Sequence, residues 1–391
     1  MRLLLALLLV SFLFISCNDT ITDSPSELIT LEKKPPKPDP EADLPPELPI
    51  LDAGEKHIIA ATMDKVYLWN TTNYELIWTY DSDNLPKVGL VNISDGSKEV
   101  IILERLQEGR GRNKSVNYYF SIFYQNDSEP QRYFLGEFDS YYNCVWDMKI
   151  GDVDNDSQDE IIVVWRDRLE IFEIDNLDVE PQHYTYELPL PIQSISPWEG
   201  EIVDYNDDGS NDGIFIAFTN ASWLFYSNGV GKYGDPYTES IGSLNLVKAS
   251  NLNSESDIEV IGGGSVNRLI AWDLGGKIIS TSNDFGDYHY TWAFDIADLD
   301  HDAGNGKEIL VGVNDGGMHL YRIDDNGEFV GNEVVSNLSF SINGLKILDE
   351  AGVILTATSN GLGVYKYVSD SDIPLITESP VDGIIEDFVC Q

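Results

Sequence analysis

Two segments of the chain place four oxygen-bearing side chains at relative positions 1, 3, 5 and 9. The first, G-D-V-D-N-D-S-Q-D-E from Gly151, contributes Asp152, Asp154, Asp156 and Glu160. The second contributes Asp204, Asn206, Asp208 and Asp212. Alternate positions of a tight loop point inward together, and hard oxygen ligands of this kind suit Ca²⁺. Carboxylates crowded in this way repel one another unless a cation neutralises them. The spacing therefore predicts one Ca²⁺ site in each loop.

Relatives of this acidic phrase differ in how well they match it. One copy has Asp298, Asp300 and Asp302 but adds two residues before Glu308, and we predict a third Ca²⁺ site there. A weaker copy has Asn251, Asn253, Glu255 and Glu259 and no aspartate. Three further copies have degenerate loops, and we expect them to form turns without metal. An interpretation without any ion remains open for all copies, because Asp and Asn side chains also cap the backbone of their own turns.

The phrase recurs about every forty to sixty residues, a period typical of solenoids and propellers. Each copy has an incoming strand, the acidic loop, a strand of the E-I-I-V-V type, a turn and a strand such as Val66–Trp69, and a fourth strand often follows. One copy is therefore one four-stranded blade. The seven copies are anchored near His57, Glu99, Glu160, Asp212, Glu259, Glu308 and Val353.

These observations predict an all-β fold, a seven-bladed β-propeller spanning residues 50–391. The first copy begins at Leu51 without an incoming strand, and the segment Val381–Glu386 has the character of an incoming strand with no loop after it. We expect this C-terminal strand to close blade one. A closed ring leaves no long exposed sheet edge.

The loops resemble the FG-GAP/VCBS repeats of integrin α-subunit propellers and of many bacterial surface proteins. The resemblance covers roughly residues 51–389, and the copies at Asp152 and Asp204 match D-x-[DN]-x-D-x-x-x-[DE] in full. It implies a seven-bladed propeller with Ca²⁺ bound in the loops.

Three tryptophans precede the acidic loops at one spacing. Trp146, Trp198 and Trp292 each lie six residues before the first predicted ligand of their loop, which puts them roughly 20 Å away at the other end of the incoming strand. Either each packs between neighbouring blades, or they form an aromatic platform for sugar rings or an extended peptide. With the tyrosines nearby, the candidate ligand-binding residues are Tyr141, Tyr142, Trp146, Trp198, Tyr288, Tyr290 and Trp292.

The chain is strongly acidic, with 67 acidic against 24 basic residues and a formal charge of −43. This balance excludes a general nucleic-acid binder, because phosphate contacts need Lys and Arg. Acidic cation ligands and an acidic surface adapted to high salt would both produce it.

The N-terminus has the pattern of a processing signal. Met1-Arg2 supplies a charge, Leu3–Ile15 is apolar and too short for an ordinary membrane span, and Ser16-Cys17 follows. It resembles a bacterial lipoprotein signal, which implies a signal peptide over residues 1–16 and an acylated Cys17. An ordinary secretory peptide and an uncleaved anchor are the alternatives.

Residues 17–49 form a polar, proline-rich linker, which favours extended polyproline II. The predicted location is therefore the bacterial cell envelope, with a lipid anchor and a periplasmic or cell-surface orientation. Membrane contact is expected through that anchor only.

No catalytic residues are assigned. The five histidines fall in different copies, and neither H-E-x-x-H nor G-x-S-x-G occurs. Acid pairs are so frequent that none can be assigned to acid–base catalysis. We predict a binding or adhesion module for a glycan or a protein, and the alternative is a calcium-dependent polysaccharide lyase or hydrolase. Whether Cys144 and Cys390 pair is left open by the sequence.

Overall fold

The computed structural model of the 391-residue chain describes most of residues 47–390. Its description leaves out residues 1–46, 52–54, 83–86, 94–96, 109–114, 127–128, 139–144, 154–155, 174–181, 188–196, 204–212, 219–220, 227–243, 253–258, 265–266, 274–276, 284, 286–289, 303–305, 315, 325–326, 336–340, 349–351 and 391. Within the described residues no helix is long and apolar enough to cross a membrane.

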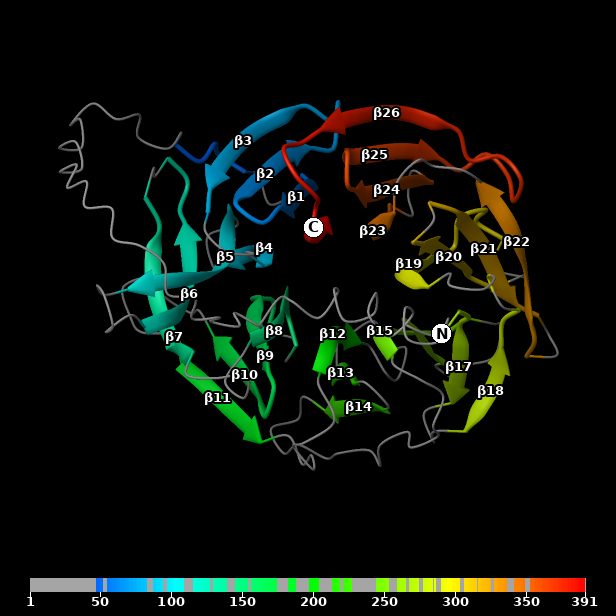
Figure 1. Ribbon diagram of the computed structural model, residues 1–391, viewed down its shortest axis with the longest axis horizontal. Helices are drawn as coiled ribbons and strands as arrows, with labels where there is room; N and C mark the ends of the chain where they lie inside the picture. The colour runs from blue at the N-terminus through cyan, green and yellow to red at the C-terminus, as the bar shows by residue number, and fades with distance from the viewer. Residues whose placement is uncertain are drawn as a thin grey trace, which may run out of the picture.

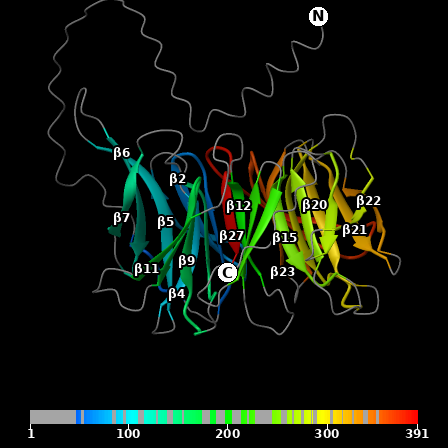
Figure 2. The ribbon, with the colours of Figure 1, turned by 90° about the horizontal axis from the view of Figure 1, so that it is seen from below.

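The described strands form seven antiparallel sheets arranged around a central axis (Figure 1). Six sheets have four strands, and sheet four has three, with residues 227–243 after its last strand outside the described part. Seen from the side, the ring is a disc about one strand thick (Figure 2). The prediction of an all-β propeller with four-stranded blades is confirmed. We number the blades one to seven in chain order.

The strands occupy four layers from the axis outward. The innermost are β27 (Asp387–Cys390), β4 (Lys87–Ile93), β8 (Val145–Gly151), β12 (Pro197–Val203), β15 (Leu244–Ser250), β19 (Thr291–Ala297) and β23 (Ile342–Leu348). Next come β1 (His57–Ala61), β5 (Ser97–Glu108), β9 (Glu160–Trp165), β13 (Gly213–Phe218), β16 (Glu259–Gly264), β20 (Glu308–Val313) and β24 (Val353–Thr358).

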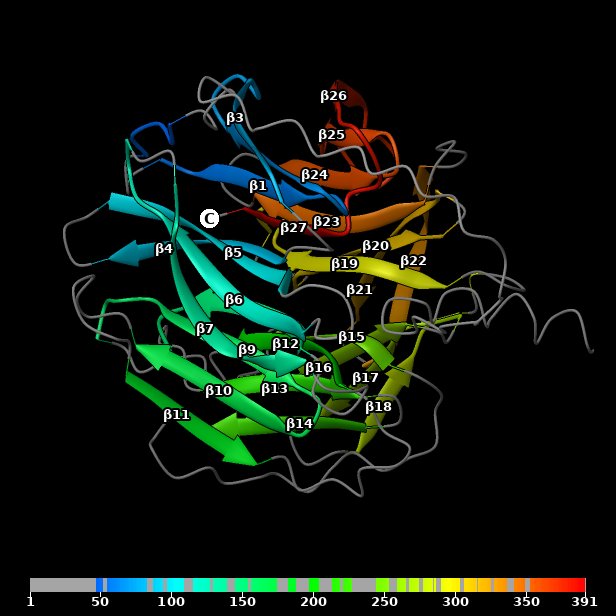
Figure 3. The same cartoon turned by 60° about the vertical axis from the view of Figure 1, so that its left-hand side comes forward.

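Two further layers lie outside these. The third consists of β2 (Lys65–Asn70), β6 (Ser115–Phe123), β10 (Arg168–Glu173), β14 (Ala221–Tyr226), β17 (Ile270–Asp273), β21 (Met318–Ile323) and β25 (Gly361–Lys366). The outermost strands are β3 (Leu76–Asp81), β7 (Gln131–Phe138), β11 (Gln182–Glu187), β18 (Ile278–Thr281), β22 (Phe329–Val335) and β26 (Leu375–Pro380). Each blade twists strongly, so that its outermost strand crosses its innermost strand at an angle (Figure 3).

The second layer explains the E-I-I-V-V pattern. Every residue of β9, β16, β20 and β24 is buried. Both faces of these strands are covered by neighbouring blades, so the strands read as continuous apolar runs instead of alternating ones. The hydrophobic clusters lie between consecutive blades; one joins Ile101 of blade two to Val163 of blade three, and another joins Leu310 of blade six to Ile354 of blade seven. The core is therefore a set of interfaces between blades.

Several of the predicted copies begin where the acidic phrase placed them. β1, β9, β16, β20 and β24 start at their anchor residues, and β13 starts one residue after Asp212. The recurring phrase thus located the second strand of each blade to within two residues.

The ring is closed by the C-terminal strand. β27 pairs antiparallel with β1, with Ile58 opposite Cys390 and Ala61 opposite Asp387. The predicted closure is confirmed, but the predicted segment Val381–Glu386 was wrong. Gly383 has a φ of +100°, and the Tyr67 hydroxyl both donates to the carbonyl of Asp382 and accepts from its N–H. That segment therefore turns, and the strand follows it.

The folded part reaches into the predicted linker. Leu48 and Leu51 are buried in the core between blades one and two, and the Leu48 carbonyl accepts from the N–H of Asn126. Packing therefore includes Leu48, two residues before the predicted start of the propeller at Ile50.

Candidate metal centre

The acid at the head of the second strand closes the loop before it. Glu308, the first residue of β20, accepts the N–H of Leu299 at 2.5 Å. Glu160 accepts the N–H of Val153 at 2.8 Å, and Glu259 that of Leu252 at 3.0 Å. All three glutamates are buried. One carboxylate oxygen of each glutamate therefore holds its loop closed. The sequence pattern alone did not distinguish this role from that of a metal ligand.

In blade three the loop curls around its carboxylates. Asp152 accepts from the N–H of Ser157 at 2.9 Å, and Asp156 from the N–H of Gln158 at 2.8 Å. Ser157 has a φ of +75°, in the left-handed region, which allows this tight return of the chain. The third predicted ligand, Asp154, lies outside the described residues. Backbone donors thus orient Asp152 and Asp156 within one small loop.

The other predicted loops can be placed only in part. Asp204, Asn206, Asp208 and Asp212 of blade four all lie outside the described residues. In blade five, Glu259 stands opposite Asp273 of the next strand, so a second acid faces the loop-closing one. In blade two, Asn92 stands at the first ligand position, and its backbone and side-chain N–H groups both donate to Asp159 of blade three.

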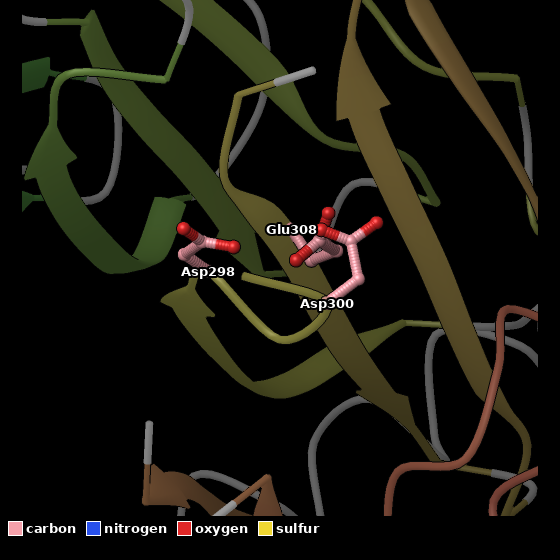
Figure 4. Close-up of side chains that lie close together, drawn as sticks. All are labelled: Asp298, Asp300 and Glu308. Carbon is pink, nitrogen blue, oxygen red and sulfur yellow. The ribbon is translucent and has the colours of Figure 1, made fainter. Parts of the chain in front are cut away.

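Blade six brings three of its predicted ligands together. Oxygen atoms of Asp298, Asp300 and Glu308 lie within 4.8 Å of one another at the end of β19 and the start of β20 (Figure 4). Two oxygens that bind one Ca²⁺ at 2.3–2.6 Å can be at most about 5 Å apart, so this spacing is compatible with a shared cation. Asp298 Oδ1 is buried and has no hydrogen-bond partner. Asp302 contributes its backbone N–H to Asp300 at 2.9 Å and is not one of the three.

A cation of the protein already contacts this cluster. Arg322 Nε donates to Glu308 Oε1 at 2.6 Å, and its Nη2 donates to Asp300 Oδ2 at 2.9 Å. The same guanidinium donates through Nη1 and Nη2 to Asp370 of blade seven at 2.5 and 3.0 Å. Arg322 therefore already donates to oxygens of two of the three carboxylates that a Ca²⁺ ion would need as ligands. The fit of Ca²⁺ to this loop is poor on that account.

The titration behaviour of these groups follows from burial and from the arginine. Burial raises the pKa of Glu308, against the opposing effects of the Leu299 N–H and of Arg322. The hydrogen bond from Arg322 lowers the pKa of Asp370. Burial alone would lower the pKa of Arg322, but its bonds to Asp370 and Glu308 outweigh burial and raise it. Arg322 is therefore a permanent positive charge in the cluster.

A shallow cavity adjoins the cluster between blades six and seven. Its volume is about 670 Å³, and Asp300, His301, Lys366, Tyr367 and Asp370 are among its lining residues. Tyr367 donates its hydroxyl to Asp370 at 2.5 Å. The cavity is on the face of the acidic loops, opposite the face on which the tryptophans were expected to bind.

The aromatic candidates are distributed around the ring. Trp146 and Trp292 are the second residues of β8 and β19, at the far end of these strands from the acidic loops, and both are half-buried. β8 and β19, which carry them, lie on opposite sides of the axis (Figure 1). Tyr290 is half-buried and donates its N–H to Asn314. Trp198 belongs to β12, and Tyr141, Tyr142 and Tyr288 lie outside the described residues.

Sequence reasoning missed a ring of paired charges on the innermost strands, which we call the channel belt. Lys248 contacts Glu201 at 2.8 Å and Asp295 at 3.7 Å, and Lys346 contacts Asp295 at 3.6 Å. Basic and acidic residues alternate at one register position from blade three to blade seven, which is a signal visible in the sequence once the blades are aligned. The belt consists of Lys87, Lys149, Lys248, Lys346, Asp147, Glu201, Asp295 and Asp387.

Three aspartates of the belt also join neighbouring blades through the backbone. Asp295 accepts the N–H of Ile347 at 2.7 Å, Asp147 that of Gly200 at 2.9 Å, and Asp387 that of Val88 at 2.7 Å. Innermost strands of different blades share no β-ladder, so these carboxylates satisfy edge N–H groups that would otherwise lack a partner in the fold.

Comparison with known proteins agrees with the fold. No protein-family model matches the chain, and no curated protein matches it. Among solved structures, dihydro-heme d1 dehydrogenase NirN is similar with a TM-score of 0.55 and 11% identity over 88% of this chain and 77% of that one. A Lactobacillus plantarum protein has a TM-score of 0.58 and 7% identity, over 86% of this chain and 99% of its own.

A third structure, a candidate 6-phosphogluconolactonase from Bacteroides uniformis, has a TM-score of 0.53 and 12% identity, again over 86% and 99% of the two chains. At these identities the likeness extends to the fold alone. The chain is thus a β-propeller protein with four-stranded blades.

Proposed function

We propose that the chain is a cell-envelope binding module on a seven-bladed, calcium-stabilised propeller of the FG-GAP/VCBS type. The observation that carries this proposal is the blade-three loop, where the N–H groups of Ser157 and Gln158 donate to Asp152 and Asp156 at 2.9 and 2.8 Å. Among the described residues only blade six gathers three carboxylates within 4.8 Å, and Arg322 already donates to two of them. The loops of blades three and four have the acidic phrase in full, and we expect a bound cation to draw their carboxylates together.

The two full loops have no arginine where blade six has one. Tyr321 stands opposite Ile309, so Arg322 follows at the level of Glu308. In blade three, Phe172 stands opposite Ile161, and the next residue is Glu173. In blade four, Ser227 follows β14. We propose that Ca²⁺ from solution neutralises these loops, because their oxygen ligands favour it.

The proposed ligands are Asp152, Asp154, Asp156 and Glu160 in blade three, and Asp204, Asn206, Asp208 and Asp212 in blade four. The ion would neutralise the carboxylates and fix each loop against its strand hairpin. Extracellular sites of this type bind with dissociation constants near 0.1–1 mM, so at millimolar calcium each would stabilise the fold by about 1 kcal/mol.

Calcium dependence is tested by thermal melting with added Ca²⁺ and with chelator. We expect Ca²⁺ to raise the melting temperature, chelator to lower it, and Asp154→Ala to remove part of the difference. A melting temperature unaffected by either addition would overturn the calcium proposal.

The proposed ligand is a glycan or a protein, bound while Cys17 and the linker that follows it hold the propeller at a membrane surface. The indoles of Trp146 and Trp292 are half-buried and so leave part of an apolar ring accessible, which suits stacking on sugars; the Nε1 atom of Trp146 is itself buried. A glycan array probed with wild type, Trp146→Ala and Trp292→Ala tests this. We expect binding without turnover, reduced in the variants. Unchanged binding in both would remove the aromatic platform, and release of unsaturated products absorbing in the ultraviolet would identify a lyase instead.

Cys17→Ala should release the protein from the membrane fraction.

A further inference from the structure

The geometry points to Arg322 as the resident cation of the sixth acidic loop, which then takes up no Ca²⁺ in the native protein. This inference rests on the proposed function in one respect: it contrasts blade six with blades three and four, where Ca²⁺ is proposed to bind. It concerns a residue outside the acidic phrase, on the third strand of its blade.

The first argument is occupancy of the ligand oxygens. Both oxygens of Glu308 are hydrogen bonded, one to the Leu299 N–H at 2.5 Å and one to Arg322 Nε at 2.6 Å. Asp300 accepts the Asp302 N–H on one oxygen and Arg322 Nη2 on the other, each at 2.9 Å. A Ca²⁺ ion drawing on these oxygens would have to share them with a guanidinium.

The second argument is charge. Two positive groups on the same oxygens repel each other, and the Arg322 side chain is only 19% exposed, so water screens that repulsion weakly. The guanidinium also does not move aside easily for an ion, because it donates to both carboxylate oxygens of Asp370 in blade seven. A bidentate pair of this kind fixes the arginine in position as well as attracting it.

The third argument is the length of the sixth loop. Between its first ligand position and its closing glutamate, the sixth loop has two residues more than the third loop. Within the sixth loop, His301 has a φ of +57°. The path of this loop therefore differs from that of the full phrase, while Arg322 replaces the acid found at its register position in blades three and five, Glu173 and Asp273. Loop and arginine together distinguish blade six.

The experiment counts bound Ca²⁺ by native mass spectrometry and isothermal titration of the full protein. A matched pair of variants removes the first ligand position of each loop: Asp298→Asn in blade six and Asp152→Asn in blade three. We expect Asp152→Asn to lower the stoichiometry by one and Asp298→Asn to leave it unchanged. Loss of one ion in Asp298→Asn would overturn the inference.

The reverse variant, Arg322→Gln, should create a site. We expect one Ca²⁺ more than in wild type and a melting temperature that becomes more sensitive to chelator. No added ion in a folded Arg322→Gln protein would also overturn the inference, and if that variant does not fold, the Asp298→Asn result decides. Wild type without any bound Ca²⁺ would refute the proposed calcium function, yet a site gained in Arg322→Gln would still support the role of Arg322.

Discussion

Arg322 and Asp370 join blades six and seven through a bidentate ion pair. The Arg322 Nη1 and Nη2 atoms donate to the two oxygens of Asp370 at 2.5 and 3.0 Å. The same guanidinium reaches Glu308 and Asp300 in its own blade. One side chain thus connects an acidic loop to the neighbouring blade beside the cavity.

The pair should make stability depend on pH in a defined direction. Arg322 lowers the pKa of Asp370 below its ordinary value of 3.8, so the contribution of Asp370 is present above that value and is lost as pH falls through the lower folded value. The Asp370 side chain is 54% exposed, so we expect no more than about 1 kcal/mol. Urea unfolding of wild type and Asp370→Asn should differ at neutral pH and converge as the pH falls below the folded pKa of Asp370. Asp372→Asn in the same loop is the control, and a difference that persists unchanged in acid would contradict this account.

Loop closure and metal binding by Glu160 can be separated by two substitutions. Glu160→Gln keeps an acceptor for the Val153 N–H and should lose only calcium-dependent stability. Glu160→Ala leaves that buried N–H unpaired and should cost about 1–3 kcal/mol even in chelator. Urea unfolding with Ca²⁺ and with chelator measures both effects.

Glu259 offers the control for this pair, because it closes the fifth loop in the same way. Glu259→Ala should be destabilising and Glu259→Gln nearly neutral, with no change in calcium dependence for either. Equal behaviour of Glu160→Gln and Glu160→Ala in chelator would show that the hydrogen bond to Val153 contributes little.

Removal of Asp295 should weaken the junction of blades six and seven. Asp295 accepts the Ile347 N–H and faces Lys248 and Lys346, and its side chain is 6% exposed. Asp295→Ala removes the acceptor of the buried Ile347 N–H and the carboxylate that faces both lysines, so we expect a loss of about 3 kcal/mol in the free energy of unfolding. Glu201→Ala, at a more exposed position of the channel belt, should cost no more than about 1 kcal/mol. Similar losses in both variants by urea unfolding would contradict a special role for the buried carboxylate.

Alkylation of Cys390 should report opening of the ring. Cys390 is buried on β27, and burial raises the pKa of its thiol to about 11, so the reactive thiolate is scarce at pH ~8. Peptide mapping after iodoacetamide treatment should show slow labelling of Cys390 in the native protein and fast labelling in urea. Asp387→Asn weakens the contacts with Lys87 and the Val88 N–H and should speed native labelling several-fold. A rate equal to wild type would mean that β27 opens independently of Asp387.

The sequence predicted the fold well because its strongest signal was local and repeated. Buried strands such as Glu160–Trp165 and Glu308–Val313 have one apolar pattern, preceded by one acidic loop, and a period of this kind needs no knowledge of distant contacts. The closing strand was misplaced by a few residues because hydrophobic pattern alone does not reveal the turn at Gly383. Its position depends on contacts with Tyr67, more than three hundred residues away.

The site was predictable only in part for the same reason. Spacing brought Asp298, Asp300 and Glu308 together correctly. Arg322, which donates to two of them, lies on the next strand, β21. It is outside the acidic phrase, so the pattern of the phrase does not predict it. The channel belt was missed because its members are about fifty residues apart and each appears as an ordinary Lys or Asp in a short strand.

The closure of blade one by β27 also dictates when the molecule can fold. The sheet of blade one is complete only when residues 387–390 pair with β1, so the ring cannot close before these residues have been synthesised. Contacts between such distant segments make folding slow, because a long loop must close before they stabilise anything. A chain interrupted before residues 387–390 would present an open edge on β1, and a neighbouring chain could pair with that edge.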